Sequence, residues 1–388
     1  MLIGKGISRD DAYRLVRYCY NNDDDDNDDD SKHDTVMMVK ASMIRDSVKG
    51  RIVTYSRKVF IPVTYLCRDY CSYCTYRKEP SSVDADSIIL KPEHILAIAE
   101  EGKRVGCTEA LLVAGERPEQ LYSEARSWFR ARGYASTIEY IADMSRLVLE
   151  KVGLLPHTNA GNLTLDEVKM LKEYNASIGL MLENASTRLM GKGMAHEHAP
   201  SKHPLLRLKT MENAGKARVA FTTGLLLGIG ESMDEVVESL IAIREMHERY
   251  KHIQEIIIQN FNPKPNTPMA DHTKPSREYM LRVVALARLI MPYMNIQVPP
   301  NLNPDFGEFL NAGINDWGGI SPVTIDHVNP EAPWPSIDHV RYVTEAYGFR
   351  LRARFPVYPE YISEEYLSSR VMEIINRMRD EHGLVRGY

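Results

Sequence analysis

The chain has 388 residues, enough for one large domain or two of medium size. Its 44% apolar and 26% charged residues allow a sizeable core and exclude wholesale disorder. The 48 basic and 53 acidic residues give a net charge of −5, so no broad basic surface is available to capture nucleic acid. Apolar runs stay far below the roughly 20 residues that cross a bilayer, and the first residues are too charged for a signal peptide. We therefore expect a cytoplasmic enzyme that binds neither nucleic acid nor membrane.

Residues 1–50 are expected to form an N-terminal extension. A short helix is predicted around Asp10–Tyr20. In the segment that follows, Asn21–Asp30 holds seven aspartates in ten positions. Such a run repels itself and cannot bury apolar surface, so residues 21–34 are predicted to be a disordered, solvated loop. Residues 51–388 are expected to form one domain with an extension at its C-terminal end.

From residue 51 onward, short runs rich in Val, Ile, Leu and Thr alternate with longer helical patterns. The runs are mostly continuous rather than alternating, as expected for strands buried on both faces. The predicted strands are Val59–Leu66, Glu109–Ala114, Gly153–His157, Ala176–Leu182, Ala217–Leu227, Gln254–Phe261, Asn295–Val298 and Gly313–Ile320. This α/β order favours a parallel (β/α)8 TIM-like barrel, with a six-unit partial barrel as the alternative.

Helix boundaries carry signals of their own. Thr164–Glu167 and Ser232–Glu235 have the spacing of capping boxes, which begin helices. Pro92 and Pro204 are each expected in a first turn, and Gly215 is expected to end the helix that Pro204 begins. Active sites of such barrels lie at the carboxyl ends of the strands, so the residues directly after each strand are the candidates for function.

Three cysteines, Cys67, Cys71 and Cys74, follow the first predicted strand with the spacing C-x3-C-x2-C. The odd total of five cysteines suits metal or redox chemistry better than a disulfide framework. A structural zinc site needs four protein ligands, so zinc would require a histidine or an aspartate as well. A cubic 4Fe–4S cluster held by only three cysteines leaves one iron open to an external ligand. Cys19 and Cys107 are expected to be inert.

With an aromatic residue before the third cysteine, this spacing resembles the defining motif of the radical S-adenosylmethionine (SAM) superfamily. Tyr73 occupies the aromatic position. The resemblance implies one 4Fe–4S cluster bound by Cys67, Cys71 and Cys74, with exchangeable SAM on the open iron. It further implies that one electron from the cluster cleaves SAM into methionine and a 5′-deoxyadenosyl radical. A low-potential electron donor is then required as a partner.

Three further strand ends are similar to the same superfamily. Gly115 and Glu116 follow the second strand, where the superfamily has a Gly-Gly-Glu-like segment against the SAM ammonium. Gly224–Glu231 resembles the G-x-I-x-G-x-x-E pattern, in which Gly228 would let adenine pack on bare backbone. An ordinary glycine-rich turn is the alternative for this segment. Glu183 ends the fourth strand, where the superfamily often places a polar residue against the ribose hydroxyls.

A second group of segments resembles the FO synthase family, and within it the cyclising subunit. The segments are Leu155–Asn162, Gly179–Glu183, Gln259–Phe261, Lys264–Pro265, Gly115–Glu119 and Gly313–Pro335. The resemblance implies formation of the deazaflavin FO (7,8-didemethyl-8-hydroxy-5-deazariboflavin) for coenzyme F420. The substrate would be 5-amino-5-(4-hydroxybenzyl)-6-(D-ribitylimino)-5,6-dihydrouracil, which a partner FO synthase subunit makes from tyrosine. The enzyme would be a lyase that releases ammonia, methionine and 5′-deoxyadenosine.

A ribityl-bearing pyrimidine needs hydrogen-bonding groups at the barrel mouth, and a phenol needs an aromatic wall. The candidates are His157, Asn159, Gln259, Asn260, Asp326, His327 and Asn329 for the polar contacts, and Phe261, Trp317 and Trp334 for the wall. Ring closure also requires proton removal, for which His327 or His157 is the predicted catalytic base. The loop His196–His203 is expected to be a lid at the substrate, with a second metal site as its alternative.

Other functions stay open at this point. Within radical SAM chemistry, the alternatives are the partner subunit that acts on tyrosine and a ring-forming enzyme of menaquinone or thiamine synthesis. From a different class, the chain could be a barrel with a structural zinc or cluster loop that only scaffolds a pathway partner.

Overall fold

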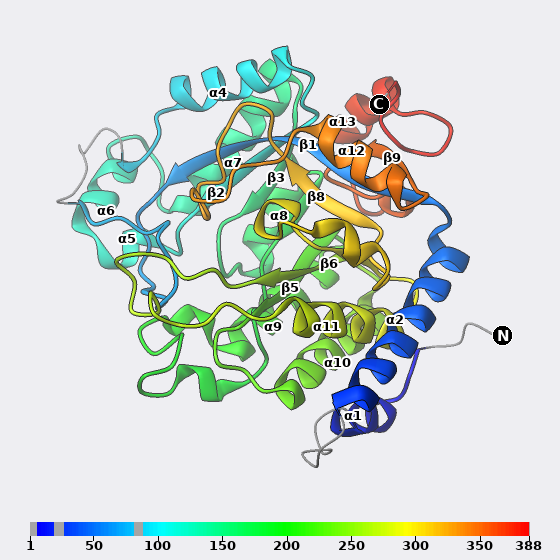
Figure 1. The fold of residues 1–388 in the computed structure, drawn as a ribbon. Helices are drawn as coiled ribbons and strands as arrows, with labels where there is room; N and C mark the ends of the chain where they lie inside the picture. The colour runs from blue at the N-terminus through cyan, green and yellow to red at the C-terminus, as the bar shows by residue number, and fades with distance from the viewer. Residues whose placement is uncertain (1–5, 19–26, 81–87, 388) are drawn as a thin grey trace.

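The computed structural model describes residues 6–18, 27–80 and 88–387. Parallel strands form a closed barrel, and helices cover its outside (Figure 1). The barrel strands are β1 (Ile52–Thr64), β2 (Glu109–Ala114), β3 (Leu155–Asn159), β4 (Ser177–Gly179), β5 (Phe221–Leu227), β6 (Ile253–Asn260), β7 (Asn295–Gln297) and β8 (Asp316–Ile320). Each strand pairs with the next along the chain, and β1 pairs with both β2 and β8. The predicted (β/α)8 barrel is thus confirmed, and the six-unit alternative is wrong.

Strand β1 is the longest, and its two halves have different neighbours. The second half pairs with β2, from Lys58 opposite Glu109 to Thr64 opposite Ala114. The first half pairs with β8 and also with β9 (Arg350–Arg354), which lies beside the barrel rather than within it. Strand β9 was not predicted, because its RLRAR sequence has three arginines in five positions and lacks the apolar run of a buried strand.

The helices follow the strands as predicted. They are α1 (Arg9–Tyr18), α2 (Asn27–Lys49), α4 (Pro92–Arg104), α5 (Pro118–Leu121), α6 (Ser123–Arg130), α7 (Thr137–Leu147), α8 (Leu165–Lys172), α9 (Pro204–Lys216), α10 (Met233–Tyr250), α11 (Arg277–Ile290), α12 (Ile337–Ala346) and α13 (Ser369–Met378). Both predicted capping boxes are present, at the start of α8 and of α10. Within the described residues, no helix is both long and apolar enough to cross a membrane.

One helix end was predicted wrongly. Helix α9 continues through Gly215 to Lys216, and Ala217 is its C-cap. Gly215 is required for packing instead, because a Cβ there would lie 2.6 Å from the Cβ of Tyr250. A glycine near a helix end therefore marked the close approach of α9 to α10 and not the end of the helix.

The N-terminal extension is more ordered than the sequence suggested. Residues 21–26 lie outside the described residues, whereas residues 27–34 form the first turns of α2 and not a loop. Asp34 also fixes this end of α2 to α11, since its two carboxylate oxygens accept from Arg282 Nε and Nη2 at 2.8 and 2.6 Å.

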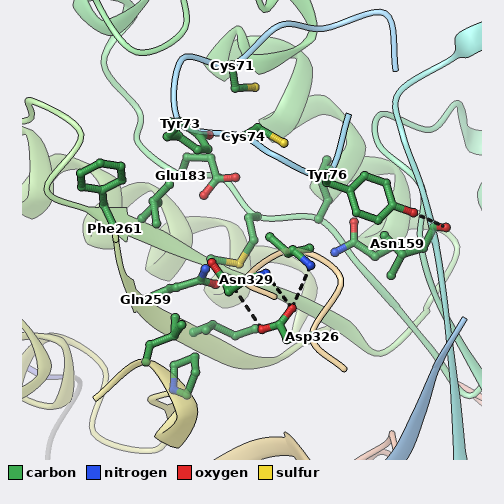
Figure 2. Close-up of a pocket in the computed structure, with 18 of the residues that line it drawn as sticks. Cys71, Tyr73, Cys74, Tyr76, Asn159, Glu183, Gln259, Phe261, Asp326 and Asn329 are labelled. Atoms are coloured by element: carbon green, nitrogen blue, oxygen red, sulfur yellow. Dashed lines mark hydrogen bonds between the residues drawn. The ribbon is translucent and has the colours of Figure 1, made fainter. Parts of the chain in front are cut away.

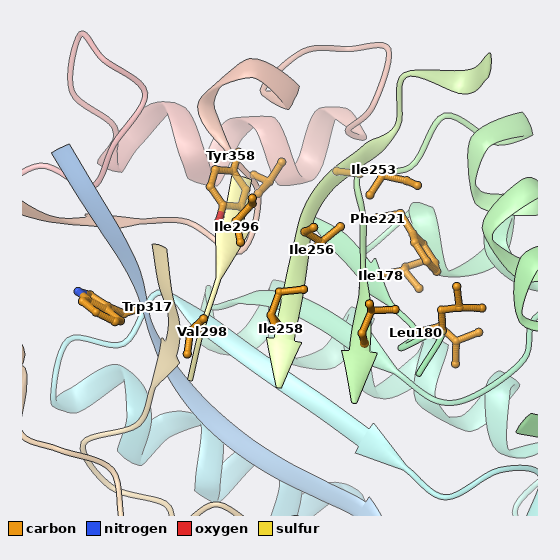
Figure 3. Packing of buried hydrophobic residues seen from close by; sticks show 14 of the residues in the cluster. Ile178, Leu180, Phe221, Ile253, Ile256, Ile258, Ile296, Val298, Trp317 and Tyr358 are labelled. Atoms are coloured by element: carbon orange, nitrogen blue, oxygen red, sulfur yellow. The ribbon is translucent and has the colours of Figure 1, made fainter. Parts of the chain in front are cut away.

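The main hydrophobic core lies around the barrel strands. In Figure 3, Ile178, Phe221 and Ile256 come from β4, β5 and β6 and pack with side chains of neighbouring strands. These side chains are fully buried. The core supports the strands, so their carboxyl ends hold fixed positions around one opening.

Candidate active site

A cavity of about 310 Å³ opens at the carboxyl ends of the barrel strands (Figure 2). Most of the sequence-predicted functional residues line it. These are Cys67, Cys71, Tyr73, Cys74, Gly115, Glu116, Asn159, Glu183, Gln259, Asn260, Phe261, Trp317, Asp326, Asn329 and Trp334. Three predicted residues, His157, Gly228 and His327, are not part of this lining.

The loop after β1 carries the three cysteines. Cys71 is buried, and Cys67 and Cys74 are half-buried. The N–H of Tyr70 donates to the carbonyl oxygen of His198 at 2.9 Å, so the cysteine loop is fastened to the segment between β4 and α9. The thiols are thereby held at one side of the cavity.

The three thiols could bind a metal group only in the deprotonated form. Among the described residues, no three His, Cys, Asp or Glu side chains converge as a site for one metal ion. This finding lends no support to the second metal site considered for His196–His203. Burial raises the pKa of Cys67 to about 12 and also raises the pKa of Cys71, so both thiols need a bound cation to become thiolates. Iron ions of a cluster supply such a charge.

Glu116 brings a buried carboxylate next to the cysteines. Its backbone N–H donates to Cys67 Sγ at 3.2 Å, and its Oε2 accepts from the N–H of Asn162 at 2.9 Å. Its Oε1 is buried and has no hydrogen-bond partner in the part of the chain that the structure describes. Burial is the main cause of its raised pKa. An unsatisfied carboxylate oxygen on a cavity wall suits a ligand ammonium group.

The nearest cation does not satisfy this oxygen. Arg117 Nε lies 3.9 Å from Glu116 Oε1, beyond hydrogen-bond distance. The Arg117 guanidinium instead binds both carboxylate oxygens of Glu167, each at 2.7 Å. Glu167 is the capping-box residue of α8, so the loop after β2 is tied to the start of that helix.

Gly115 is needed where β2 meets the cysteine loop. A Cβ at this position would lie 2.1 Å from the carbonyl oxygen of Leu66 and 2.6 Å from the Cβ of Cys67. No larger residue fits without moving the loop. The glycine therefore allows the close contact between Glu116 and Cys67.

Glu183 lies in the cavity wall, paired with a residue that the sequence did not single out. Lys202 Nζ is 2.5 Å from Glu183 Oε1, and both side chains are largely buried. Lys202 belongs to the predicted lid His196–His203, so this loop does border the cavity. The same loop contacts the cysteine motif, since the hydroxyl of Tyr73 and Nε2 of His196 are 3.0 Å apart.

Gly228 lies in a turn that is held by the Glu231 carboxylate. Its N–H donates to Glu231 Oε1 at 2.7 Å, and the N–H of Ile229 donates to Glu231 Oε2 at 2.8 Å. A Cβ on Gly228 would lie 2.6 Å from Pro275 Cδ, and its φ of +89° favours glycine. These contacts are those of a glycine-rich turn. Leu226 is the residue of this motif that lines the cavity.

His157 lies deeper in the barrel. It lines a second cavity of about 150 Å³, and its Nδ1 is 2.6 Å from the hydroxyl of Ser177. Burial lowers the pKa of His157 to about 4, so the ring is neutral near neutral pH. Lys58 and Gln259 line both cavities, which are therefore neighbours inside the barrel.

His327 stands behind the wall of the main cavity. Its Nδ1 is 2.9 Å from the hydroxyl of Tyr65, and its ring centroid is 5.1 Å from that of Phe60. Burial lowers the pKa of His327 below its usual value. Its chain neighbours Asp326 and Val328 do line the cavity.

Asp326 organises the loop after β8. Its Oδ1 accepts from the N–H groups of Val328 and Asn329 at 2.9 and 3.1 Å. Its Oδ2 accepts from the side-chain amides of Asn301 and Asn329, each at 3.1 Å (Figure 2). Both oxygens are therefore occupied, which suits a residue that shapes the wall.

Sequence reasoning missed several polar residues of the cavity. They are Lys58, Arg207, Gln297 and Asn301, whereas Lys202 and Lys264 lie in segments that the sequence singled out but were given no role of their own. Most of these lie outside any recognisable motif. A signal did exist for Gln297, which lies within a predicted strand, and for Lys58, which directly precedes one, because a buried polar residue in a strand requires a partner or a function.

Comparisons with known proteins agree with this geometry. Residues 61–243 match the model of the radical SAM superfamily. A 7,8-didemethyl-8-hydroxy-5-deazariboflavin synthase of Methanopyrus kandleri is 50% identical over 336 residues, which cover 86% of this chain and 100% of that protein. The Methanocaldococcus jannaschii protein of the same name is 48% identical, with 87% of this chain and 93% of that protein covered. An FO synthase of Streptomyces coelicolor is 42% identical over 91% of this chain but only 42% of its own length.

Solved structures support the fold. The FeFe-hydrogenase maturase HydG from Carboxydothermus hydrogenoformans has a TM-score of 0.72 at 19% identity, covering 97% of this chain and 83% of that one. Methylornithine synthase (PylB) has a TM-score of 0.65 at 18% identity, covering 89% and 94%. At such low identity these likenesses concern the fold alone. The sequence matches go further, and by them the chain belongs to the 7,8-didemethyl-8-hydroxy-5-deazariboflavin synthase family of the radical SAM superfamily.

Proposed function

We propose that this protein is a radical SAM lyase that forms the deazaflavin FO in the biosynthesis of coenzyme F420. Its substrate would be 5-amino-5-(4-hydroxybenzyl)-6-(D-ribitylimino)-5,6-dihydrouracil, and ammonia would be released as the third ring closes. One observation carries this proposal beyond family membership. The three cysteines share a single cavity with a wall of amide and aromatic side chains from the opposite strands.

The cysteine side of the cavity is proposed to hold the cofactors. Cys67, Cys71 and Cys74 would bind one 4Fe–4S cluster, which when loaded supplies the electron that cleaves SAM. Glu116 would accept hydrogen bonds from the SAM ammonium through its unsatisfied Oε1. Glu183 would orient a hydroxyl-bearing part of the same ligand once Lys202 shares or releases its carboxylate.

The remaining wall is proposed to hold the substrate. Phe261 packs in the same small apolar cluster as Tyr73, which suits the hydroxybenzyl group near the cofactor side. Asn159, Gln259 and Asn329 offer donors and acceptors to the polar part of the substrate. The loop 196–203 would keep water from the site, because it is joined to the cysteine loop and to Glu183.

A catalytic histidine remains part of the proposal, although neither candidate histidine lines the main cavity. His157 and His327 each stand one layer away from the main cavity, so proton transfer through either would need an intervening group. For His327 that group would have to be one other than Tyr65, because Tyr65, whose hydroxyl lies 2.9 Å from His327 Nδ1, does not line the cavity. For His157 it would be a polar side chain where the two cavities meet.

Two protein partners are proposed as well. A low-potential electron donor would reduce the cluster, and a separate FO synthase subunit would supply the adduct. Support for the second partner comes from the Streptomyces coelicolor FO synthase, because this chain matches only 42% of the length of that protein.

Anaerobic turnover of the reconstituted protein tests the function. With SAM, a reductant and the preformed adduct, we expect a fluorescent deazaflavin, ammonia and 5′-deoxyadenosine together. Omitting the adduct and adding tyrosine with 5-amino-6-ribitylaminouracil serves as the comparison. Consumption of tyrosine without any use of the adduct would identify the protein as the partner subunit and overturn the proposal.

A further inference from the structure

Four polar side chains encircle the place where the main cavity meets the inner cavity that His157 lines. They are Lys58 of β1, Asn159 of β3, Gln259 of β6 and Gln297 of β7, and we call them the polar collar. All four line both cavities. The collar therefore crosses the barrel just beneath the proposed substrate site.

Among the described residues, no hydrogen bond or ion pair joins a collar side chain to the rest of the protein, so their polar atoms face the two cavities. Lys58 and Gln297 are only 9% and 7% exposed. Buried polar groups in folded proteins are nearly always hydrogen-bonded, because leaving one unsatisfied costs stability. Lys58 and Gln297 are buried in this sense, whereas Asn159 and Gln259 are half-buried, and all four face the cavities, where a polar ligand can complete their hydrogen bonds.

The barrel makes room for this arrangement through two consecutive glycines of β8. A Cβ on Gly319 would lie 2.3 Å from Cδ of Lys58, and a Cβ on Gly318 would lie 2.0 Å from Nε2 of Gln297. The Lys58 stem thus passes over bare backbone, and its Nζ comes to rest 4.7 Å from the ring centre of Trp334. A cation over an aromatic ring is held in place without losing its hydrogen-bond donors.

The chemistry of the collar points to one kind of ligand group. Lys58 can only donate, so it requires an oxygen acceptor, and each carboxamide offers a donor beside an acceptor. Alternating carbonyl and N–H groups, as on the edge of a pyrimidinedione ring, match this set. The inner cavity does not need a ligand in the same way. At its floor, Arg354 is already paired with Asp316 and Glu255 at 2.7 and 3.0 Å.

We propose that the polar collar binds the carbonyl–NH–carbonyl edge of the pyrimidine ring of the substrate, with Lys58 donating to a ring carbonyl oxygen. This inference rests on the proposed function and adds an orientation to it. The pyrimidine edge points down into the barrel, and the hydroxybenzyl group lies toward Phe261 and the cysteine loop (Figure 2). Burial lowers the pKa of Lys58, whereas nearby Glu109 and Asp326 favour its charged form.

Binding of the fluorescent product FO to the reconstituted holoenzyme tests the orientation without turnover. Fluorescence anisotropy would compare the unmodified protein with Lys58→Met, which keeps the length of the side chain but removes its donors. Loss of a hydrogen bond from a charged group should weaken FO binding about 10- to 100-fold. Gly319→Ala is a second variant, expected to weaken binding in the same direction by displacing the Lys58 stem. Lys103→Met on the outer helix α4 is the matched control and should bind FO as the unmodified protein does.

A second ligand separates the pyrimidine edge from the ribityl chain. An FO analogue with a methyl group in place of the ribityl chain should lose affinity for Lys58→Met by the same factor as FO. A loss confined to FO would place the polyol in the collar, and unchanged FO binding would remove the collar from the substrate site; either result overturns the proposal. The proposed function fails separately, if the unmodified protein makes no FO from the adduct. Thermal unfolding of each variant shows whether a weaker signal comes from unfolded protein.

Discussion

The backbone N–H of Glu116 donates a hydrogen bond to Sγ of Cys67, with 3.2 Å between the two atoms. One residue therefore contacts a proposed ligand of the cluster through its backbone and faces the cavity with its carboxylate. Gly115 makes the contact possible, and Asn162 fixes the orientation of the carboxylate through Oε2. A ligand that uses the free Oε1 would thus be held at a defined position relative to Cys67.

We predict that Glu116→Gln weakens SAM binding while the cluster stays intact. The change keeps the shape and the backbone contact to Cys67 but removes the negative charge that favours an ammonium. A lost charge-assisted hydrogen bond corresponds to a Kd about 10- to 100-fold higher. Equilibrium dialysis of the reconstituted protein against SAM measures this Kd. Glu101→Gln, on the exposed face of α4, is the control. SAM affinity equal to that of the unmodified protein would show that Glu116 does not contact the ammonium.

Single replacement of Cys67, Cys71 or Cys74 by Ala should remove SAM cleavage, because two remaining thiolates cannot hold the cluster. We expect each variant to fold and to bind substoichiometric iron. Iron content and 5′-deoxyadenosine yield are the measurements. Cys107→Ala is a matched control, since Cys107 is also buried but its thiol donates to the carbonyl oxygen of Lys58, away from the cysteine loop. A normal yield of 5′-deoxyadenosine from any of the three variants would contradict the cluster assignment.

His327→Ala tests whether His327 is the catalytic base, as the sequence predicted, although it lies outside the cavity lining. Because His327 contacts Tyr65 and Phe60 behind the cavity wall, we expect FO and 5′-deoxyadenosine to fall by equal factors. A positioned acid–base group contributes about 10²–10⁴-fold to a rate. A fall of that size in FO alone, with SAM cleavage retained, would establish His327 as the base. Tyr65→Phe, which removes only the hydroxyl, then shows whether its contact with His327 Nδ1 positions the ring.

The barrel and its cysteine loop could be predicted because local signals agree with the global fold. Continuous apolar strands, capping boxes and the C-x3-C-x2-C spacing each act over a few residues. Lys58 and Lys202 were missed because their importance depends on contacts between segments far apart in the chain, such as Lys202 with Glu183. His327 was assigned to the cavity from its place after β8, but the chain bends at residues 327–329, so a position after a strand does not fix the direction of each side chain. Asp326 and Val328 face the cavity, and His327 between them does not.

Removal of residues 21–26 should leave turnover and cluster content unchanged. The helix α2 that follows packs against α11 on the outside of the barrel, and Asp34 provides its ion pair to Arg282. The deletion keeps this pair. Asp34→Ala in the full chain should instead lower thermal stability, by about 1–3 kcal/mol for a charge-assisted pair, without changing SAM affinity. Loss of iron on deletion of 21–26, with the protein still folded, would contradict this view of the acidic segment.

The stability of the protein should fall as the pH is lowered from about 6.5 to 4, and His157 should be one cause. Burial lowers the folded-state pKa of His157 to about 4, whereas an unfolded histidine titrates near 6.5. Between these values the unfolded state binds more protons than the folded state, so the free energy of unfolding rises with pH through this window. The full difference corresponds to about 3 kcal/mol, reached below pH 4. His157→Gln, which keeps a polar group near Ser177, should flatten the dependence of urea unfolding on pH between 6.5 and 4. An identical slope in the variant and the unmodified protein would mean that His157 is already protonated in the folded barrel near pH 6.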